Sequence, residues 1–133
     1  MKIAVSHLDQ IAEIFILQCT TQYPCLPHQA NLAVIPTLIG AFPQHGVGFS
    51  DHTIGNLAAV TAVGLGAKIV EKHFTLDKSL EGTDHVLSDT PQELKALVEQ
   101  IRQVEILMGD PNKEPIPEEL EIRDMVRSRF PKS

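Results

Sequence analysis

Residues 14–19 read Ile-Phe-Ile-Leu-Gln-Cys, which is a short and unbroken apolar run. A run of this length without alternation is typical of a strand that is buried on both faces, as in a parallel sheet. Two further strands are expected at 46–50, Gly-Val-Gly-Phe-Ser, and at 67–71, Ala-Lys-Ile-Val-Glu. The helical patterns that follow the strands lie at about 34–42, 54–65 and 91–108. This alternation predicts three consecutive βα units.

The last of these helices has the clearest boundaries. Thr90 is a candidate N-cap, Pro91 suits the first helical position, and Glu93 stands three residues after the cap, which is the capping-box pattern. Gly109 follows the apolar stripe of this helix, and Gly66 follows that of the preceding helix. Glycine readily adopts the left-handed conformation that ends a helix, so we expect both helices to stop there.

The length of the chain limits the fold that these units can form. The chain has 133 residues, whereas a complete (β/α)8 barrel needs roughly 200 or more. The predicted fold class is α/β, a truncated TIM barrel of about three parallel βα units. Residues 1–13 resemble a degenerate first helix, 14–109 form the barrel part, and 110–133 form a charged, proline-containing tail with a short helix near 118–127. Such a partial sheet has two unpaired edges, which favour association with another chain.

Composition excludes several classes of function. With 11 basic and 17 acidic residues the formal net charge is −6, and 43% of residues are hydrophobic. This is the balance of a soluble globular domain, and an acidic chain has no general attraction for nucleic acid or an anionic membrane. No apolar run is long enough to span a bilayer. Two cysteines, Cys19 and Cys25, are too few for a disulfide scaffold, and we expect a cytoplasmic protein.

Polar residues follow all three predicted strands, where parallel βα folds place their active sites. Thr21 and Tyr23 follow the first strand, and His52 and His73 follow the second and third. The two histidines are 21 residues apart, which is about one βα unit, and imidazoles at adjacent strand ends can share one divalent ion. The alternative is that each histidine only forms hydrogen bonds at the end of its strand.

Structural alternatives also exist for the other polar candidates. Ser50 and Asp51 can bind a phosphate or cap the following helix. Tyr23 can bind a substrate or only pack in its loop, and Asp84 can contact a substrate hydroxyl or be a solvated turn residue. Successive residues of a strand point to opposite sides. If His73 points into the site, Lys72 points away from it, so we expect Lys72 to have a structural role. The sequence has no Gly-rich phosphate loop and no nucleophile elbow.

Three blocks carry a family resemblance: 18–24 (QCTTQYP), 48–55 (GFSDHTIG) and 66–77 (GAKIVEKHFTLD). They resemble the N-acetylneuraminate (sialic acid) synthase family, which includes the synthases of legionaminic and pseudaminic acid. Their order and spacing match over roughly residues 14–109. The resemblance implies a (β/α)8 barrel that condenses phosphoenolpyruvate with an N-acetylmannosamine-type sugar, with formation of a carbon–carbon bond and release of phosphate. This chain is similar to the last three βα units of that barrel.

The resemblance further implies roles for individual residues. His52 and His73 match the catalytic histidines that hold a divalent ion, Mn²⁺ or Mg²⁺, which polarises the sugar aldehyde. The substrate-binding residues that it implies are Thr21, Tyr23, Ser50 and Asp84. The loop at Asp84 has Thr83 where the family usually has proline. The first five strands of such a barrel, which supply lysines and glutamates to the site, and its small C-terminal antifreeze-like domain have no counterpart in this sequence.

Two functions of different kinds stay open at this point. In the first, the chain contributes the metal-binding part of a sialic acid-type synthase. It then needs another chain, either a further copy or the missing barrel half, or it is a piece of a longer natural chain. In the second, it is a non-catalytic remnant or association module that retains the motifs. A third candidate, a different metal-dependent barrel enzyme, disagrees with the order of the blocks. Phosphoenolpyruvate is multiply anionic, and no cluster of Arg or Lys follows the strands, so the isolated chain is expected to lack synthase activity.

Overall fold

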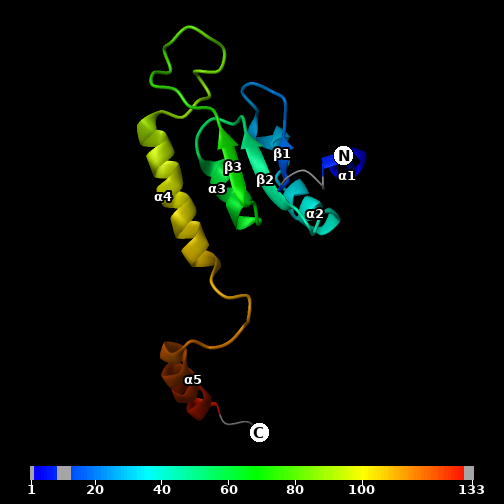
Figure 1. Ribbon diagram of the computed structural model, residues 1–133. Coiled ribbons are helices and arrows are strands. Elements are labelled where there is room, and N and C mark those ends of the chain that lie inside the picture. Colours follow the sequence, from blue (N-terminus) through cyan, green and yellow to red (C-terminus); the bar gives the residue numbers. More distant parts are fainter. Residues whose placement is uncertain (1, 9–12, 131–133) are drawn as a thin grey trace.

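The computed structural model describes residues 2–8 and 13–130 and contains one parallel sheet with helices packed beside it (Figure 1). The strands β1, β2 and β3 are hydrogen-bonded in chain order, with β2 in the centre. This confirms the predicted α/β class and the three parallel strands. The elements in chain order are α1 (Lys2–Leu8), β1 (Phe15–Cys19), η1 (Pro27–Gln29), α2 (Val34–Ala41), β2 (Gly46–Asp51), α3 (Leu57–Gly64), β3 (Ile69–Lys72), α4 (Pro91–Met108) and α5 (Pro117–Arg129).

The largest differences from the predicted boundaries lie at the starts of α3 and β3. Helix α3 begins at Leu57 and not at 54, because Gly55 has a φ of 81° and Asn56 occupies the N-cap position. Strand β3 begins at Ile69 and not at 67, because the Ala67 N–H donates to the carbonyl of Ala62 and so still belongs to the end of α3. Gly66 has a φ of 102°, as expected for the residue that ends this helix.

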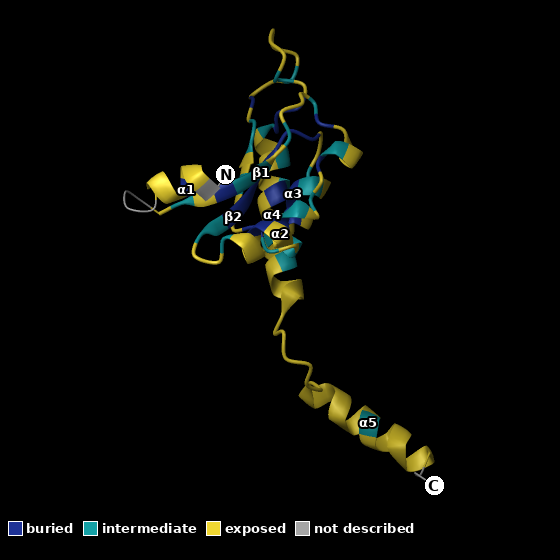
Figure 2. Cartoon of the chain, turned by 90° about the vertical axis from the view of Figure 1, so that its right-hand side faces the viewer, coloured by how far each residue is buried: buried dark blue, intermediate teal, exposed yellow. Residues whose placement is uncertain are grey.

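The hydrophobic core lies on the side of the sheet that the helices cover (Figure 2). Ile16, Val47 and Phe49 point from the strands toward Ile35 and Leu38 of α2. The prediction that the first strand is buried on both faces is wrong, because Phe15 and Cys19 on one face of β1 are exposed and Leu17 between them is only partly buried. No second layer of described residues covers the other face.

Gly46 and Gly48 of β2 lie on the uncovered face. Because they have no side chains, those of β1 and β3 can lie across the central strand. Phe15 and Ile69 stand on this face, and each is 37% exposed. A Cβ at Gly48 would lie 2.5 Å from Leu17 Cδ2 and 2.5 Å from the Ile69 carbonyl oxygen. A side chain at this position would therefore collide with backbone, so glycine is required where β1 and β3 approach the central strand.

Helix α4 begins with the capping box that its sequence predicts. The Thr90 N–H donates to Glu93 Oε2 at 2.8 Å, and the Glu93 N–H donates to Thr90 Oγ1 at 3.4 Å. Lys78 Nζ adds a further bond to Glu93 Oε1 at 2.7 Å. The Lys78 ammonium and the Thr90 groups stabilise the carboxylate and lower the pKa of Glu93 to about 2.

This depressed pKa makes the stability of the fold depend on pH. The Glu93 carboxylate stabilises the folded state fully above its ordinary pKa of 4.5 and loses this effect as the pH falls toward about 2. Glu93→Gln is expected to reduce the loss of unfolding free energy between these two pH values, measured by urea denaturation. Glu99→Gln, in an exposed pair with Lys95 on the same helix, serves as the control. Equal pH dependence in both variants would contradict the assignment.

The C-terminal helix α5 extends away from the sheet and its helices, and almost all of its residues are exposed (Figures 1 and 2). It confirms the predicted short helix near 118–127 and is slightly longer at both ends. At the other end of the chain, α1 lies within the segment predicted as a degenerate helix, and residues 9–12 of that segment lie outside the described residues. Among the helices of the described ranges, none combines the length and apolar character that a membrane crossing requires.

Candidate functional site

The carboxyl ends of the three strands meet at one edge of the sheet, and the polar candidates follow these ends (Figure 1). Cys19, Ser50 and Glu71 stand side by side in the ladder. His52 directly follows β2, and His73 directly follows β3. Both histidines therefore leave the sheet at the same level on adjacent strands.

Three aromatic rings form the centre of the site. The centroids of the His52 and His73 rings are 5.3 Å apart, and their planes are inclined by 66°. The Tyr23 ring lies 4.1 Å from that of His52 and 5.7 Å from that of His73. The expectation that the two imidazoles lie near each other agrees with this geometry. Tyr23 packs against both of them and is not merely a loop residue.

The surroundings of the two Nδ1 atoms differ between the histidines. His52 is buried, and its Nδ1 lies 2.9 Å from the carbonyl oxygen of Thr20. A carbonyl oxygen can only accept, so this Nδ1 carries the proton and the neutral ring keeps its lone pair on Nε2. The Nδ1 of His73 lies 3.7 Å from Asp84 Oδ2, and both of these side chains are partly exposed. Asp84 therefore faces His73 and remains open to solvent.

The donor set of this pair fits part of a metal site. Imidazole nitrogens bind first-row divalent ions, and Mn²⁺ accepts them more readily than Mg²⁺, a hard cation that prefers oxygen. Within the described ranges, no group of three or more His, Cys, Asp or Glu side chains is arranged to hold a metal. The two histidines can thus supply two ligands, and the remaining positions need water, substrate or residues from elsewhere.

The other predicted substrate residues lie around the rings in different settings. Ser50 is buried, and its Oγ donates to Glu71 Oε1 at 2.7 Å. Thr21 is exposed on the loop that follows β1 and forms no side-chain hydrogen bond to a described residue. Glu71 was missed as a site residue. The signal was available, because Ser50 and Glu71 are separated by 21 residues, the same spacing as the two histidines.

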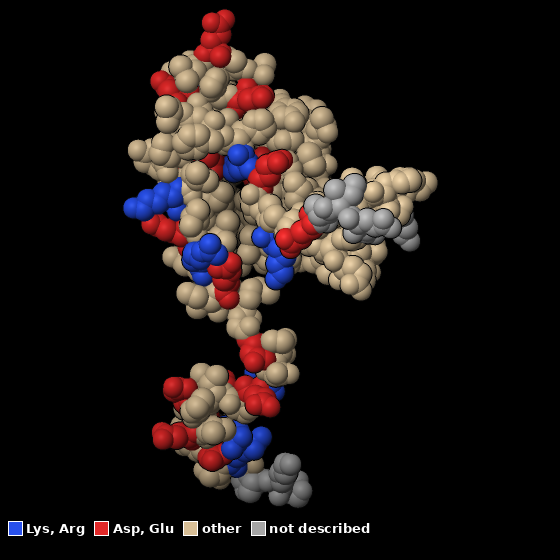
Figure 3. All heavy atoms as spheres, in the orientation of Figure 1, with Lys and Arg blue, Asp and Glu red and all other residues tan. Residues whose placement is uncertain are grey.

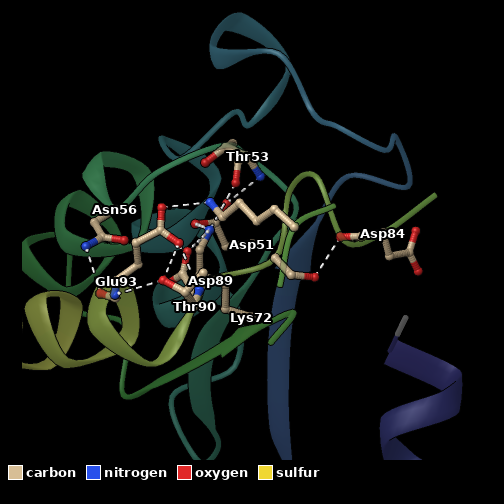
Figure 4. Close-up of polar contacts among 10 residues, drawn as sticks. Asp51, Thr53, Asn56, Lys72, Asp84, Asp89, Thr90 and Glu93 are labelled. Carbon is tan, nitrogen blue, oxygen red and sulfur yellow. Dashed lines mark hydrogen bonds and ion pairs between the residues drawn. The ribbon is translucent and has the colours of Figure 1, made fainter. Parts of the chain in front are cut away.

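A buried charge cluster lies beneath these residues, on the helix-covered side (Figure 4). The alternative reading of Asp51 as the cap of the next helix is wrong, because Asn56 occupies that position. Instead, Asp51 Oδ1 accepts from the Thr53 N–H at 2.8 Å, and Asp51 Oδ2 lies 3.0 Å from Lys72 Nζ. The nearby Asp89 is also buried, and burial raises the pKa of its carboxyl. As expected, Lys72 points away from the rings and into the protein.

Comparison with known proteins places the chain in a family. The NeuB family model matches residues 1–113, and the chain belongs to this family. The N,N′-diacetyllegionaminic acid synthase of Legionella pneumophila is 47% identical over 114 residues, which are 86% of this chain and 32% of the relative. The human N-acetylneuraminate-9-phosphate synthase is 45% identical over 104 residues, which are 78% of this chain and 29% of the relative.

A solved structure shows the same arrangement of elements. The N-acetylneuraminic acid (sialic acid) synthetase of Leptospira borgpetersenii, determined in complex with citrate, superposes with a TM-score of 0.87 and 32% sequence identity. The match covers 99% of this chain and 46% of the Leptospira chain. The present chain spans about a third of the length of the curated relatives it matches.

Proposed function

We propose that this chain forms the last three βα units of a barrel enzyme that condenses phosphoenolpyruvate with an N-acetylmannosamine-type sugar. The reaction forms a carbon–carbon bond, releases phosphate and yields a nonulosonic acid. The observation that carries the proposal is the cluster of Tyr23, His52 and His73 at the strand ends, within the segment that matches the NeuB family. The names of the relatives support the same chemistry.

In this proposal His52 and His73 hold a divalent ion. When bound, such an ion supplies Lewis-acid polarisation of the sugar aldehyde. The Thr20 carbonyl fixes the His52 ring with Nε2 available as a ligand atom. Tyr23 covers the same ring, excludes water from that side and presents its hydroxyl to the substrate.

Ser50 and Asp84 bind the two substrates on either side of the histidines. Ser50 lies in the central strand with its hydroxyl held by Glu71, and we assign it to phosphoenolpyruvate. Asp84 is half-exposed beside His73, so its carboxylate can accept hydrogen bonds from sugar hydroxyls. We assign Thr21, on the loop that carries Tyr23, to the outer part of the substrate site.

Phosphoenolpyruvate carries several negative charges, and basic residues from outside this segment are needed to neutralise them. On the face drawn in Figure 3, the Lys and Arg side chains of the described residues lie among Asp and Glu and form no separate basic patch. Lys72, although close in sequence to His73, has a side chain that is only 3% exposed and paired with carboxylates. A multiply anionic substrate would thus stay largely uncompensated on this chain alone.

The sheet itself provides the surface on which the missing part would assemble. Strands β1 and β3 are the edges of the sheet, and the apolar Phe15 and Ile69 lie on its uncovered face. A separate groove between the segment after β3 and helix α4 is also apolar; its lining includes Phe74, Leu94 and Val98. We infer that the other βα units of the barrel cover these groups.

This proposal is tested by reassembly. The chain alone is expected to release no measurable phosphate from phosphoenolpyruvate and N-acetylmannosamine. Mixed with the first five βα units of a complete NeuB-family barrel, it is expected to form a complex on size exclusion and to release phosphate in the presence of Mn²⁺. The same mixture with His52→Ala serves as the control and is expected to form the complex without turnover.

The alternative function predicts a different result. The uncovered sheet face also suits a non-catalytic association module, which would form the complex and release no phosphate with either variant. Such a result, or equal activity with and without His52, would contradict the proposed synthase function.

A further inference from the structure

We propose that Lys72 is a positioning residue whose buried ammonium connects the ends of β2 and β3 to the start of α4 and thereby sets the separation of His52 and His73. The proposal rests on the proposed function only in that this pair is the working part of the site. It concerns a residue that faces away from the substrate side and touches neither imidazole in any contact described above.

The ammonium of Lys72 faces three groups from two segments, the end of β2 and the residues before α4 (Figure 4). Its Nζ donates to Asp51 Oδ2 at the end of β2 and to the Thr53 carbonyl just beyond it, each at 3.0 Å. Asp89 Oδ1, directly before α4, lies 4.0 Å away. The Lys72 side chain is 3% exposed, and those of Asp51 and Asp89 are 0% and 1% exposed.

Each of the residues in these contacts either adjoins one of the two histidines in sequence or is hydrogen-bonded to one. Asp51 and Thr53 flank His52 in sequence, and Lys72 directly precedes His73. The Asp89 N–H donates to the His73 carbonyl oxygen at 2.8 Å. In the ladder Asp51 is the register partner of Lys72. The ion pair therefore joins the two residues from which the chain leaves the sheet toward the two rings.

The electrostatics of the cluster make Lys72 its central member. Neither carboxylate oxygen of Asp89 has a hydrogen-bond partner in the described part of the chain, so the Lys72 ammonium is the cation that faces it. Without this ammonium, two carboxylates would remain buried with no counter-charge between them, and the strand ends would separate to admit water. A buried ion pair stabilises a fold little compared with apolar packing, and its best-attested use is to specify one arrangement.

The test measures the arrangement of the rings directly and needs no metal. In the full chain, NMR is expected to give nuclear Overhauser cross-peaks between the ring protons of His52 and His73, whose centroids are 5.3 Å apart. Lys72→Met keeps the length of the side chain and removes the charge, and it is expected to lose these cross-peaks while the amide spectrum stays dispersed. Lys72→Arg, which keeps a cation, is expected to restore them in part.

Lys78→Met is the matched control. Lys78 also forms an ion pair, with Glu93 at 2.7 Å, but its side chain is partly exposed, and within the described residues no hydrogen bond or ion pair joins it to Asp51, Thr53 or Asp89. The cross-peaks are expected to persist in this variant. Cross-peaks of unchanged intensity in folded Lys72→Met would overturn the proposal. If that variant does not fold, Asp51→Asn, which preserves the volume of the carboxylate, takes its place. Loss of the cross-peaks in Asp51→Asn would support the proposal, and unchanged cross-peaks would overturn it.

A second measurement separates this inference from the proposed function. Mn²⁺ titration of the wild-type chain and of Lys72→Met, followed by electron paramagnetic resonance, is expected to show weaker binding in the variant and unchanged binding in Lys78→Met. If the wild-type chain binds no Mn²⁺, the metal-binding part of the proposed function fails. The cross-peaks between the rings would still decide whether Lys72 positions the histidines.

Discussion

Replacing His52 with alanine is expected to weaken Mn²⁺ binding by the full chain roughly 10-fold or more, because loss of a direct ligand costs at least as much as the ~10–100-fold typical of an outer-shell partner. His73→Ala is expected to have the same effect, since the two rings lie 5.3 Å apart and each supplies one nitrogen in the proposed site. The dissociation constant is measured from the electron paramagnetic resonance signal of free Mn²⁺. The double variant is expected to bind Mn²⁺ no more tightly than an unspecific carboxylate surface does.

His28→Ala is the control for this experiment. His28 is exposed in η1 (Pro27–Gln29) and belongs to none of the ring contacts at the strand ends. Its replacement is expected to leave Mn²⁺ affinity unchanged. If all three single variants bind equally well, the ion does not bind between His52 and His73, and the proposed site is wrong.

The largest loss of stability is expected from Phe49→Ala. Phe49 lies in the central strand with 1% of its surface exposed and belongs to the core cluster between the sheet and the helices. Truncation of a buried phenylalanine leaves a cavity and lowers the free energy of unfolding by about 3–5 kcal/mol. Because a whole domain is stable by only ~5–15 kcal/mol, this change is readily measured by urea denaturation.

Phe130→Ala provides the same chemical change at an exposed position. Phe130 is 76% exposed at the end of α5, so its truncation is expected to alter the unfolding free energy by no more than about 0.5 kcal/mol. A similar loss in both variants would mean that Phe49 is not part of a packed core. Because both variants change phenylalanine to alanine, the difference between their losses of unfolding free energy measures the effect of burial.

The spacing of 21 residues explains why much of the site could be predicted. The ladder pairs Gly48 with Ile69, so any residue near the end of β2 meets the residue 21 positions later on β3. His52 and His73 were found through this spacing. The same offset links Ser50 to Glu71, and the hydrogen bond between these two side chains was not among the predicted contacts.

The position of Asp89 could not be derived in this way. It follows a long loop, and no periodic pattern links residue 89 to Lys72. Its carboxylate reaches the ammonium because the segment after the loop pairs with the segment after β3, where Thr75 N–H donates to the Asp89 carbonyl at 2.9 Å. Such a contact depends on how the loop closes.

The amino-acid sequence alone determined the three βα units, the capped start of α4 at Thr90 and the placing of His52 and His73 at strand ends. These features follow from periodicity, capping and glycine conformation, which act over a few residues. The tertiary structure decided that one face of β1 stays uncovered and that Lys72 is buried between two carboxylates. Burial depends on which distant segments cover a side chain, and short-range chemistry does not contain that information.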